Sequence, residues 1–390
     1  MRKIFLYLSA CCLAAALLPA TAQEIDGNMP VFYQQLKATL QYPLSWENAG
    51  IRPGRNGKAP ARKFLQWQAR GRQQVLTCLS PAPPSDGRWN METVAEEKRD
   101  GYTAKKIMFN VNDWCRTAAY LLVPDGEGPH PAVLVLHDHG AHFTIGKEKT
   151  VRPFGVTEAV MKDAEDWTVS CYDGVFIGDE MARAGYVVLS TDALFWGERG
   201  RRQGADYDAQ QALNANLEQM GMSFGSFIVW DDLRSADFLA SLPMVKTGGI
   251  AVVGHSMGCY RAWTAAALSD AVKACVAVCW MNTTEHLMTL TNNQNKGGSA
   301  YSMIIPGIRN YMDYPDVASL ACPKPVFFMN GRQDKLFPVE GVEAAYAVMR
   351  KVWQDNGAGE QFHTKITDGP HYYDKAMQRE ALQFLDSVMK

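Results

Sequence analysis

The sequence has little net charge, and beyond residue 18 it has no apolar run long enough to cross a membrane. Its 39 lysines and arginines nearly balance 41 aspartates and glutamates, which gives a formal net charge of −2. Because positive charge is not in excess, the composition does not indicate nucleic-acid binding. Internal repeats and low-complexity tracts are also missing, so the signature of a repeat architecture is absent. What remains is a globular protein of 390 residues, 47% of them hydrophobic, which is long enough for a large core.

The number of cysteines does not favour a disulfide framework. The chain has 9 cysteines, of which Cys11 and Cys12 lie in the predicted export signal described below. The odd number left after its removal argues against a framework in which every cysteine is paired. Cys275 and Cys279 lie in an apolar run, where a free thiol behaves as a small hydrophobic group. A single disulfide remains compatible with the sequence.

The N-terminus has the pattern of a secretory signal. Arg2 and Lys3 precede an apolar run over residues 4–18, and Ala20-Thr21-Ala22 forms a small-residue cleavage site. We therefore expect residues 1–22 to be removed and the mature protein to be periplasmic or secreted. Leu8 to Cys11 imitates a lipoprotein box, but the apolar run before Cys11 is too short, and we do not expect a lipid anchor.

The mature chain divides into two parts at about residue 89. Residues 23–88 contain two helical patterns separated by a loop rich in glycine, proline and arginine, and we expect an N-terminal helical extension. From residue 89 to 390, apolar runs typical of strands alternate with helical patterns after three successive strands. A long polar connection is expected over residues 144–172. Residues 281–322 form an insertion too long for a simple connection, and such insertions are commonly lids or binding loops.

The alternation of strands and helices predicts an α/β fold. The run Pro131 to Leu136 is apolar and too short for a helix, as expected of a central strand buried on both faces. Helices between such strands cover both faces of a mostly parallel sheet. Ligands of such sheets bind at the carboxyl ends of the strands. The residues that follow each strand are therefore the candidates for function.

The clearest motif is Gly-x-Ser-x-Gly at Gly254, Ser256 and Gly258. It lies between the apolar run Ile250 to Val253 and a helical pattern, the context of a nucleophile elbow. The tight turn strains the backbone at the serine and leaves no room for side chains at the flanking positions, which the two glycines satisfy. Ser256 is therefore the candidate nucleophile.

A serine hydroxyl needs a base and a group that orients the base. Asp334 follows the strand pattern of residues 324–330, and His371 follows that of residues 362–367. The order serine, aspartate, histidine is that of α/β-hydrolases. Asp368 is a rival for the acid, but it lies three residues from His371 and is expected to shape the loop.

Ester attack also requires two backbone donors for the oxyanion. One follows the nucleophile, here Met257, and the other comes from the loop after an early central strand. In that loop we expect the amide of His139 to serve, with Ala141 as the alternative.

The same loop, residues 137–142, resembles the zinc-hydrolase pattern His-x-His-x-Asp-His, but Ala141 occupies the position of the aspartate. No downstream ligand set completes such a site, so we predict neither a catalytic metal nor a cofactor. His137 and His142 are expected to form local hydrogen bonds.

Substrate-binding candidates lie in loops that face the same cleft. Arg199, Arg201 and Arg202 could bind a carboxylate, or they could form a solvated charged segment. Lys147 and Lys149 are weaker candidates of the same kind. The aromatic candidates are Trp196 and Trp280, which could form an apolar wall or a sugar platform; for Trp280, core packing is equally compatible with the sequence.

From residue 89 onward the chain resembles the α/β-hydrolase superfamily, in particular dienelactone-hydrolase-like and acetyl-xylan-esterase-like proteins. The resemblance is carried by residues 136–143 (LHDHGAHF), 231–243 (DDLRSADFLASLP), 254–263 (GHSMGCYRAW), 279–283 (CWMNT), 313–338 and 368–373 (DGPHYY). It implies Ser256, Asp334 and His371 as the triad. Ser256 stands where true dienelactone hydrolases have cysteine, which favours ester hydrolysis.

With the export signal, the core also looks like bacterial carbohydrate esterases, including a group similar to pectin methylesterases. This resemblance implies a secreted serine carboxylesterase that acts on plant polysaccharide esters, first of all methyl esters of galacturonate. The alternatives are an acetyl esterase acting on xylan or a similar glycan, a serine peptidase of the same fold, and a noncatalytic glycan-binding protein. A peptidase of this kind usually carries an N-terminal propeller, whose repeats this chain lacks.

Overall fold

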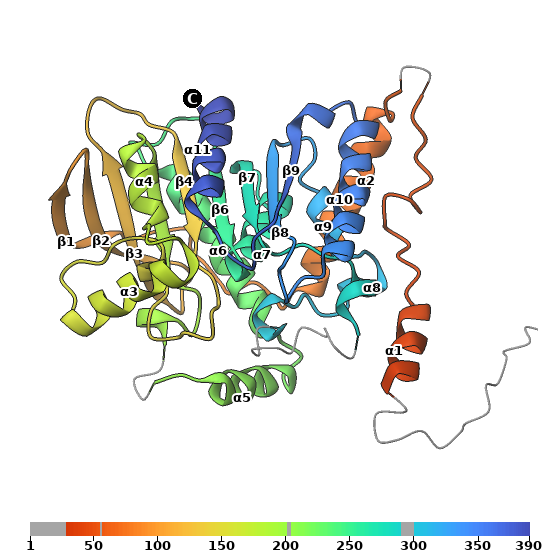
Figure 1. Ribbon diagram of the computed structural model, residues 1–390, viewed down its shortest axis with the longest axis horizontal. Helices are drawn as coiled ribbons and strands as arrows, with labels where there is room; N and C mark the ends of the chain where they lie inside the picture. The colour runs from red at the N-terminus through yellow and green to blue at the C-terminus, as the bar shows by residue number, and fades with distance from the viewer. Residues whose placement is uncertain (1–28, 55–56, 201–203, 290–299) are drawn as a thin grey trace, which may run out of the picture.

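The computed structural model describes residues 29–54, 57–200, 204–289 and 300–390, which are coloured in Figure 1. The predicted signal over residues 1–22, and Arg201 and Arg202, lie outside the described residues. None of the described helices is long and apolar enough to cross a membrane.

One mixed sheet organises the described chain, and its strands follow the order β1-β2-β3-β5-β4-β6-β7-β8-β9 (Figure 1). The strands β4 to β9 are mutually parallel, whereas β1, β2 and β3 form an antiparallel end that joins the rest through β5. Their bounds are Glu92–Arg99, Tyr102–Asn110, Arg116–Pro124, Ala132–Leu136, Val187–Thr191, Ile250–His255, Val272–Val278, Val326–Gly331 and Phe362–Thr367 for β1 to β9. This is the mostly parallel sheet that the sequence predicts.

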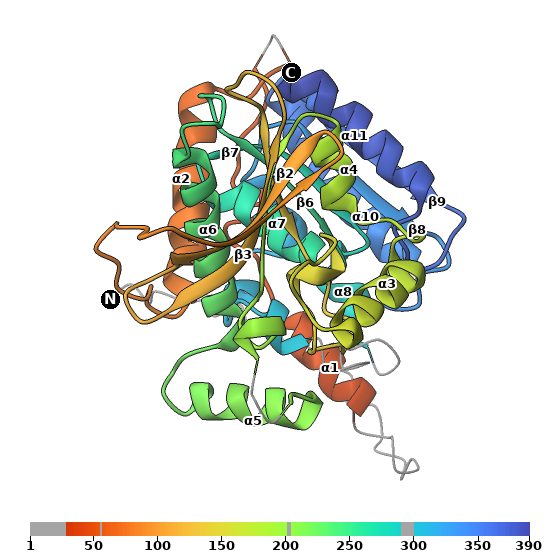
Figure 2. The same cartoon turned by 90° about the vertical axis from the view of Figure 1, so that its left-hand side faces the viewer.

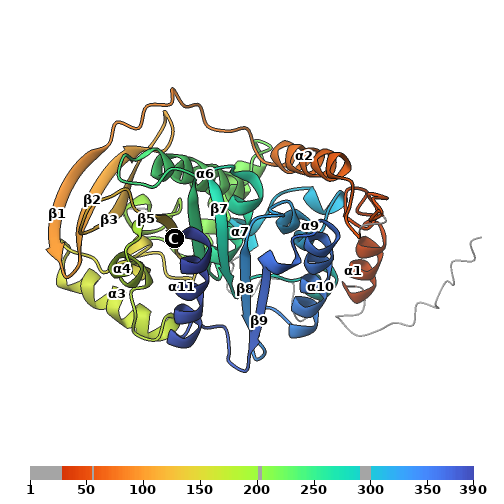
Figure 3. The same cartoon turned by 90° about the horizontal axis from the view of Figure 1, so that it is seen from above.

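Helices cover both faces of the sheet. Figure 3 shows α2 and α6 on one face and α3, α4 and α11 on the other. The helices α1 to α11 span Met29–Ala38, Ala61–Cys78, Glu158–Cys171, Ile177–Arg183, Tyr207–Glu218, Phe224–Ser241, Met257–Leu268, Thr284–Leu287, Tyr314–Ser319, Val339–Asp355 and Lys375–Met389. Short 3₁₀ turns η1 to η5 span Lys147–Lys149, Gly197–Arg199, Ala300–Met303, Ile308–Asn310 and Gly359–Gln361.

The central strands are buried on both faces because each face has its own hydrophobic core. In β4, Leu134 and Leu136 join the core with α6 and α7, and Val133 and Val135 join the core with α4 and α11. This explains why the strand is a continuous apolar run rather than an alternating one. The two cores hold the carboxyl ends of the parallel strands at one edge.

The N-terminal helix α2 packs against the same body. Phe64, Trp67 and Val75 belong to the core that also contains α6 and α7. The side-chain amide of Gln68 donates hydrogen bonds of 2.8 and 2.7 Å to the carbonyls of Leu320 and Cys322, which ties α2 to the segment before β8. In Figure 2, α5 lies apart at the bottom of the molecule.

The expected polar connection over residues 144–172 contains a helix, α3, and this part of the prediction is wrong. The side chain of Thr157 caps α3 by accepting a hydrogen bond from the amide of Val160 at 3.4 Å. Only Ala164 and Thr168 of this helix are buried, so its apolar stripe is too narrow to stand out in the sequence.

The turn from β6 into α7 depends on two close backbone approaches. A Cβ on Gly258 would lie 1.9 Å from the carbonyl oxygen of Leu136 at the end of β4, and a Cβ on Gly254 would lie 2.0 Å from the carbonyl oxygen of Gly258. Both distances are far below van der Waals contact with a rigid backbone atom. Side chains are therefore excluded at both positions, as the motif requires.

We expect Gly258→Ala to lower the free energy of unfolding by more than about 2 kcal/mol, because the methyl group forces β4 and α7 apart. Gly359→Ala is the matched control, since its Cβ would come no nearer than 3.4 Å to another atom, an ordinary contact with Gln354, and it should change stability by less than about 1 kcal/mol. Chemical denaturation of both variants measures the difference. Equal stability of the two variants would contradict the close approach.

Candidate active site

Ser256 lies at the turn between β6 and α7, in a backbone conformation that side chains rarely adopt. Its φ of 56° and ψ of −122° are outside the regions favoured by non-glycine residues. Its amide donates a 2.8 Å hydrogen bond to the carbonyl of Val278 on β7, which holds the turn in place. The strained turn presents the hydroxyl at the carboxyl edge of the sheet.

His371 and Asp334 reach this hydroxyl from two later loops. His371 lies between β9 and α11, and its Nε2 is 2.9 Å from the Oγ of Ser256. Its Nδ1 is 2.7 Å from the Oδ2 of Asp334, which follows β8. The structure therefore brings together the three side chains that the sequence predicts, and we call them the Ser256–His371–Asp334 array.

The carboxylate of Asp334 is fixed in orientation. Its Oδ1 accepts hydrogen bonds from the amides of Leu336 and Phe337 at 2.8 and 3.3 Å, so Oδ2 faces the imidazole. The Asp334 side chain is fully buried, whereas that of Asp368 is 99% exposed. The rival carboxylate thus lies at the surface, next to Arg332.

Two backbone amides are available near the serine. Met257 is the first residue of α7, where an amide has no acceptor within the helix. In the described part of the chain, the amides of Met257 and His139 donate no hydrogen bond, whereas the amide of Ala141 donates to the Nδ1 of His139 at 2.9 Å. Of the two residues considered for the second oxyanion donor, His139 therefore has the free amide.

Buried charges hold the loop that carries His139. The Nζ of Lys149 donates to the carbonyls of His139 and Asp138 at 2.9 and 3.1 Å. The Asp138 carboxylate accepts from the Tyr172 hydroxyl at 2.6 Å and from the Trp167 indole at 3.1 Å. Burial alone would raise the pKa of Asp138, but the Lys149 charge and these donors outweigh it and hold that pKa below its usual value. Lys149 is buried and bound to its own loop.

A second buried ion pair ties the helix of the elbow to the same loop. Arg261 on α7 makes a two-pronged contact with Asp232 on α6, at 2.9 and 2.7 Å, and both side chains are at most 3% exposed. The Nη1 of Arg261 also donates to the carbonyl of His137 at 3.3 Å. The sequence patterns did not single out Arg261; its position five residues after the nucleophile was the available signal.

Comparison with known proteins places this geometry in a family. The model of the Abhydrolase family matches residues 55–377. The chain belongs to the Abhydrolase family. A Bacillus subtilis (strain 168) protein named as a hydrolase, YtaP, is 27% identical over 320 residues, which cover 82% of this chain and 98% of that protein.

Solved structures show the α/β-hydrolase fold. A Bacteroides fragilis protein named as an acetyl xylan esterase aligns with a TM-score of 0.65 and 19% identity, over 90% of this chain and 84% of its own. A glucuronoyl esterase from Solibacter usitatus aligns with 0.61 and 14% identity, over 87% and 97%. The methylesterase BT1017 aligns with 0.55 and 15% identity, over 93% and 68%.

In this Abhydrolase family member, the predicted cationic candidates are engaged in ion pairs. The Nη1 of Arg199 lies 2.5 Å from the Oδ2 of Asp231, and each side chain is 9% exposed. The Nζ of Lys147 lies 2.9 Å from Asp192 and 2.7 Å from Glu198, and the Lys147 side chain is fully buried. Arg199 and Lys147 are therefore bound to carboxylates of the protein itself.

The two aromatic candidates are packed inside. Trp196 is fully buried, stacks on Phe224 and donates its indole N–H to the carbonyl of His139 at 3.2 Å. Trp280 is 1% exposed and packs among Tyr260 and Tyr314. Of the two alternatives for Trp280, the structure shows core packing.

The histidines of the early loop form local contacts. The Nε2 of His137 accepts from the amide of Ala193 at 2.9 Å, and burial lowers the pKa of His137 so that it stays neutral. The Nε2 of His142 is 2.6 Å from Asp163, and its ring stacks on Trp167. Both imidazoles therefore form local hydrogen bonds, as the sequence predicts.

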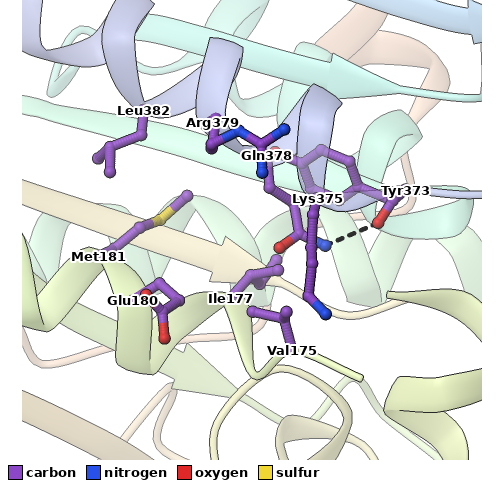
Figure 4. Close-up of a pocket in the computed structure, with 9 residues that line it drawn as sticks. All are labelled: Val175, Ile177, Glu180, Met181, Tyr373, Lys375, Gln378, Arg379 and Leu382. Carbon is purple, nitrogen blue, oxygen red and sulfur yellow. Dashed lines mark hydrogen bonds between the residues drawn. The ribbon is translucent and has the colours of Figure 1, made fainter. Parts of the chain in front are cut away.

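A cavity of about 320 Å³ lies between α4 and α11 (Figure 4). Apolar and charged side chains of both α4 and α11 line it, and no member of the Ser256–His371–Asp334 array does. Its link to the array is Tyr373, two residues after His371 in the chain.

We predict that Arg199→Met destabilises the protein by about 3–5 kcal/mol, because it leaves the buried Asp231 carboxylate without its partner. The double variant Arg199→Met with Asp231→Leu should recover most of this loss. Arg183→Met is the control, since Arg183 pairs with Glu180 at the surface, with side chains 45% and 56% exposed, and its loss should cost less than about 1 kcal/mol. Urea unfolding gives the comparison; an Arg199 variant as stable as the control would contradict a structural role.

Proposed function

We propose that this Abhydrolase family member is an exported serine carboxylesterase. One observation carries the proposal: Ser256, His371 and Asp334 are joined in series by hydrogen bonds of 2.9 and 2.7 Å. A histidine held in this way accepts the proton of a serine hydroxyl while the carboxylate stabilises the resulting imidazolium. The two free amides of Met257 and His139 lie on the elements that supply an oxyanion hole in such hydrolases.

In the first half of the reaction, the Oγ of Ser256 attacks the carbonyl carbon of the ester and its proton passes to the Nε2 of His371. The carbonyl oxygen becomes an oxyanion, which the amides of Met257 and His139 bind. When the tetrahedral intermediate collapses, the bond to the alcohol oxygen breaks and His371 returns the proton to the leaving alcohol. Ser256 then carries the acyl group.

In the second half, water replaces the alcohol. His371 takes one proton from the water as its oxygen attacks the acyl carbon, and the same two amides bind the second oxyanion. Collapse breaks the bond to the Oγ of Ser256, which recovers its proton from His371. The carboxylic acid leaves and the enzyme is restored, so the cycle consumes one water and requires no cofactor.

The proposed substrate is an ester on a plant polysaccharide, first of all a methyl ester of galacturonate. The predicted export signal over residues 1–22 supports this proposal, because an exported enzyme would meet polysaccharides outside the cell. The structural relatives named above are an acetyl xylan esterase, a glucuronoyl esterase and a methylesterase, and all three names describe esterases. An acetyl ester of xylan is the second candidate. It is supported by the alignment with the acetyl xylan esterase, whose TM-score of 0.65 exceeds the 0.55 of the methylesterase.

We expect Asp334→Asn to lower kcat roughly 10⁴-fold with little change in KM, because the imidazole would lose the partner that sets its tautomer. Asp368→Asn is the matched control: this carboxylate is 99% exposed, 3.8 Å from Arg332, and its loss should change kcat by no more than about twofold. Steady-state hydrolysis of a chromogenic ester compares the two variants. A larger loss of kcat in Asp368→Asn than in Asp334→Asn would show that Asp334 is not the carboxylate that orients His371.

We expect the wild-type protein to release methanol from methyl-esterified pectin faster than acetate from acetylated xylan. Ser256→Ala protein serves as the blank for spontaneous hydrolysis in both assays. Acetate release exceeding methanol release would move the assignment to the second candidate. Release of neither product above the Ser256→Ala blank would contradict a polysaccharide ester as the substrate.

A further inference from the structure

His255 immediately precedes the nucleophile and is buried without a polar partner. The residue is 1% exposed, and neither ring nitrogen has a hydrogen-bond partner among the described residues. A neutral imidazole has one nitrogen lone pair to offer, and here no described group uses it.

That lone pair lies beside two further metal-ligating groups. One ligand atom from each of His255, Cys279 and His371 lies within 4.8 Å of the other two. The rings of His255 and His371 are 5.0 Å apart between centroids. The thiol of Cys279 lies 3.7 Å from the carbonyl of Tyr372 and also contacts the backbone of Gly331, and the residue is fully buried.

The fold itself brings these groups together. His255 ends β6, and Cys279 follows β7, the strand that pairs with β6. The loop between β9 and α11 brings His371 beside His255, and the next residue of that loop, Tyr372, contacts Cys279. The positive φ of 59° at Cys279 turns the chain just after β7, and its amide donates a 2.8 Å hydrogen bond to the carbonyl of Met329. Two of the three ligands therefore stand on rigid strand ends.

We propose that His255, Cys279 and His371 form a binding site for a soft divalent cation such as Zn²⁺, and that its occupancy inhibits the hydrolase. The inhibitory part rests on the proposed function. One thiolate and two imidazoles are a donor set that zinc prefers. Ligand atoms of a tetrahedral zinc site lie roughly 3.3–3.8 Å apart, so small side-chain rotations within the 4.8 Å cluster complete the geometry. Water or the Oγ of Ser256 is the fourth ligand.

Either mode of binding removes the base. If the cation takes the Nε2 of His371, the lone pair that accepts the Ser256 proton is occupied. If it takes Nδ1, the hydrogen bond to Asp334 is lost and the proton moves to Nε2, which can then only donate to Ser256. In both cases Ser256 has no general base, and the Cys279 thiol releases its proton to the solvent as the metal–sulfur bond forms.

Binding is tested first without any enzymatic reaction, on Ser256→Ala protein titrated with Cd²⁺. Cadmium replaces zinc and gives an ultraviolet charge-transfer band when it binds a thiolate. We expect the Ser256→Ala protein to bind one equivalent of Cd²⁺ tightly. A second substitution, Cys279→Ala, should abolish the band, and His255→Gln in its place should lower the Cd²⁺ affinity at least about tenfold. Adding Cys275→Ala instead is the control, since this cysteine is equally buried on β7, and the band should persist. A band unaffected by Cys279→Ala would overturn the site.

Inhibition is tested on the active enzyme with Zn²⁺ and reversal by EDTA. Each variant is compared with its own zinc-free rate, and Cys279→Ala should raise the inhibitory zinc concentration at least about tenfold, whereas Cys275→Ala should not. Zinc inhibition of equal strength in both variants would overturn the proposal. Cadmium binding by a protein that hydrolyses no ester would leave the metal site standing and remove the proposed function, so the two failures are distinguishable.

Discussion

The contact between Gly258 and the carbonyl oxygen of Leu136 is the constraint on which the rest of the site depends. A Cβ at this position would lie 1.9 Å from that oxygen, so α7 can begin this close to β4 only with glycine. The approach lets the chain turn at Ser256 with a φ of 56°. Within the five residues Gly254 to Gly258, the two glycines permit the strained turn, and the turn determines where the Ser256 hydroxyl lies.

Buried ion pairs then fix what surrounds the turn. Lys149 holds the carbonyls of the loop that carries His139, and Arg261 joins α7 to Asp232 and to the carbonyl of His137. Such pairs contribute little net stability, because desolvation offsets their attraction, but they leave few alternative arrangements. The free amide of His139 is held at the carboxyl edge of the sheet by these charges together with the packing of its ring against Phe143 and Trp196.

The sequence predicted the sheet, the elbow and the positions of Asp334 and His371, because each depends on local patterns and on the rule that parallel strands end at one edge. It could not predict the partners of the charged residues. Arg199 is held by Asp231, which lies 32 residues further along the chain on another helix, and no local pattern reveals that contact. The same reason hid the cluster of His255 and Cys279: their meeting depends on the pairing of β6 with β7.

The proposed mechanism requires Ser256 to become covalently acylated, and labelling by a fluorophosphonate probe tests this most directly. The probe reacts with a serine hydroxyl only where a base and an oxyanion hole activate it. We expect one phosphonyl group per chain, located on the peptide that contains Ser256, and slow or absent labelling of His371→Ala protein. Absence of labelling in the wild-type protein, or a label on another residue, would contradict it.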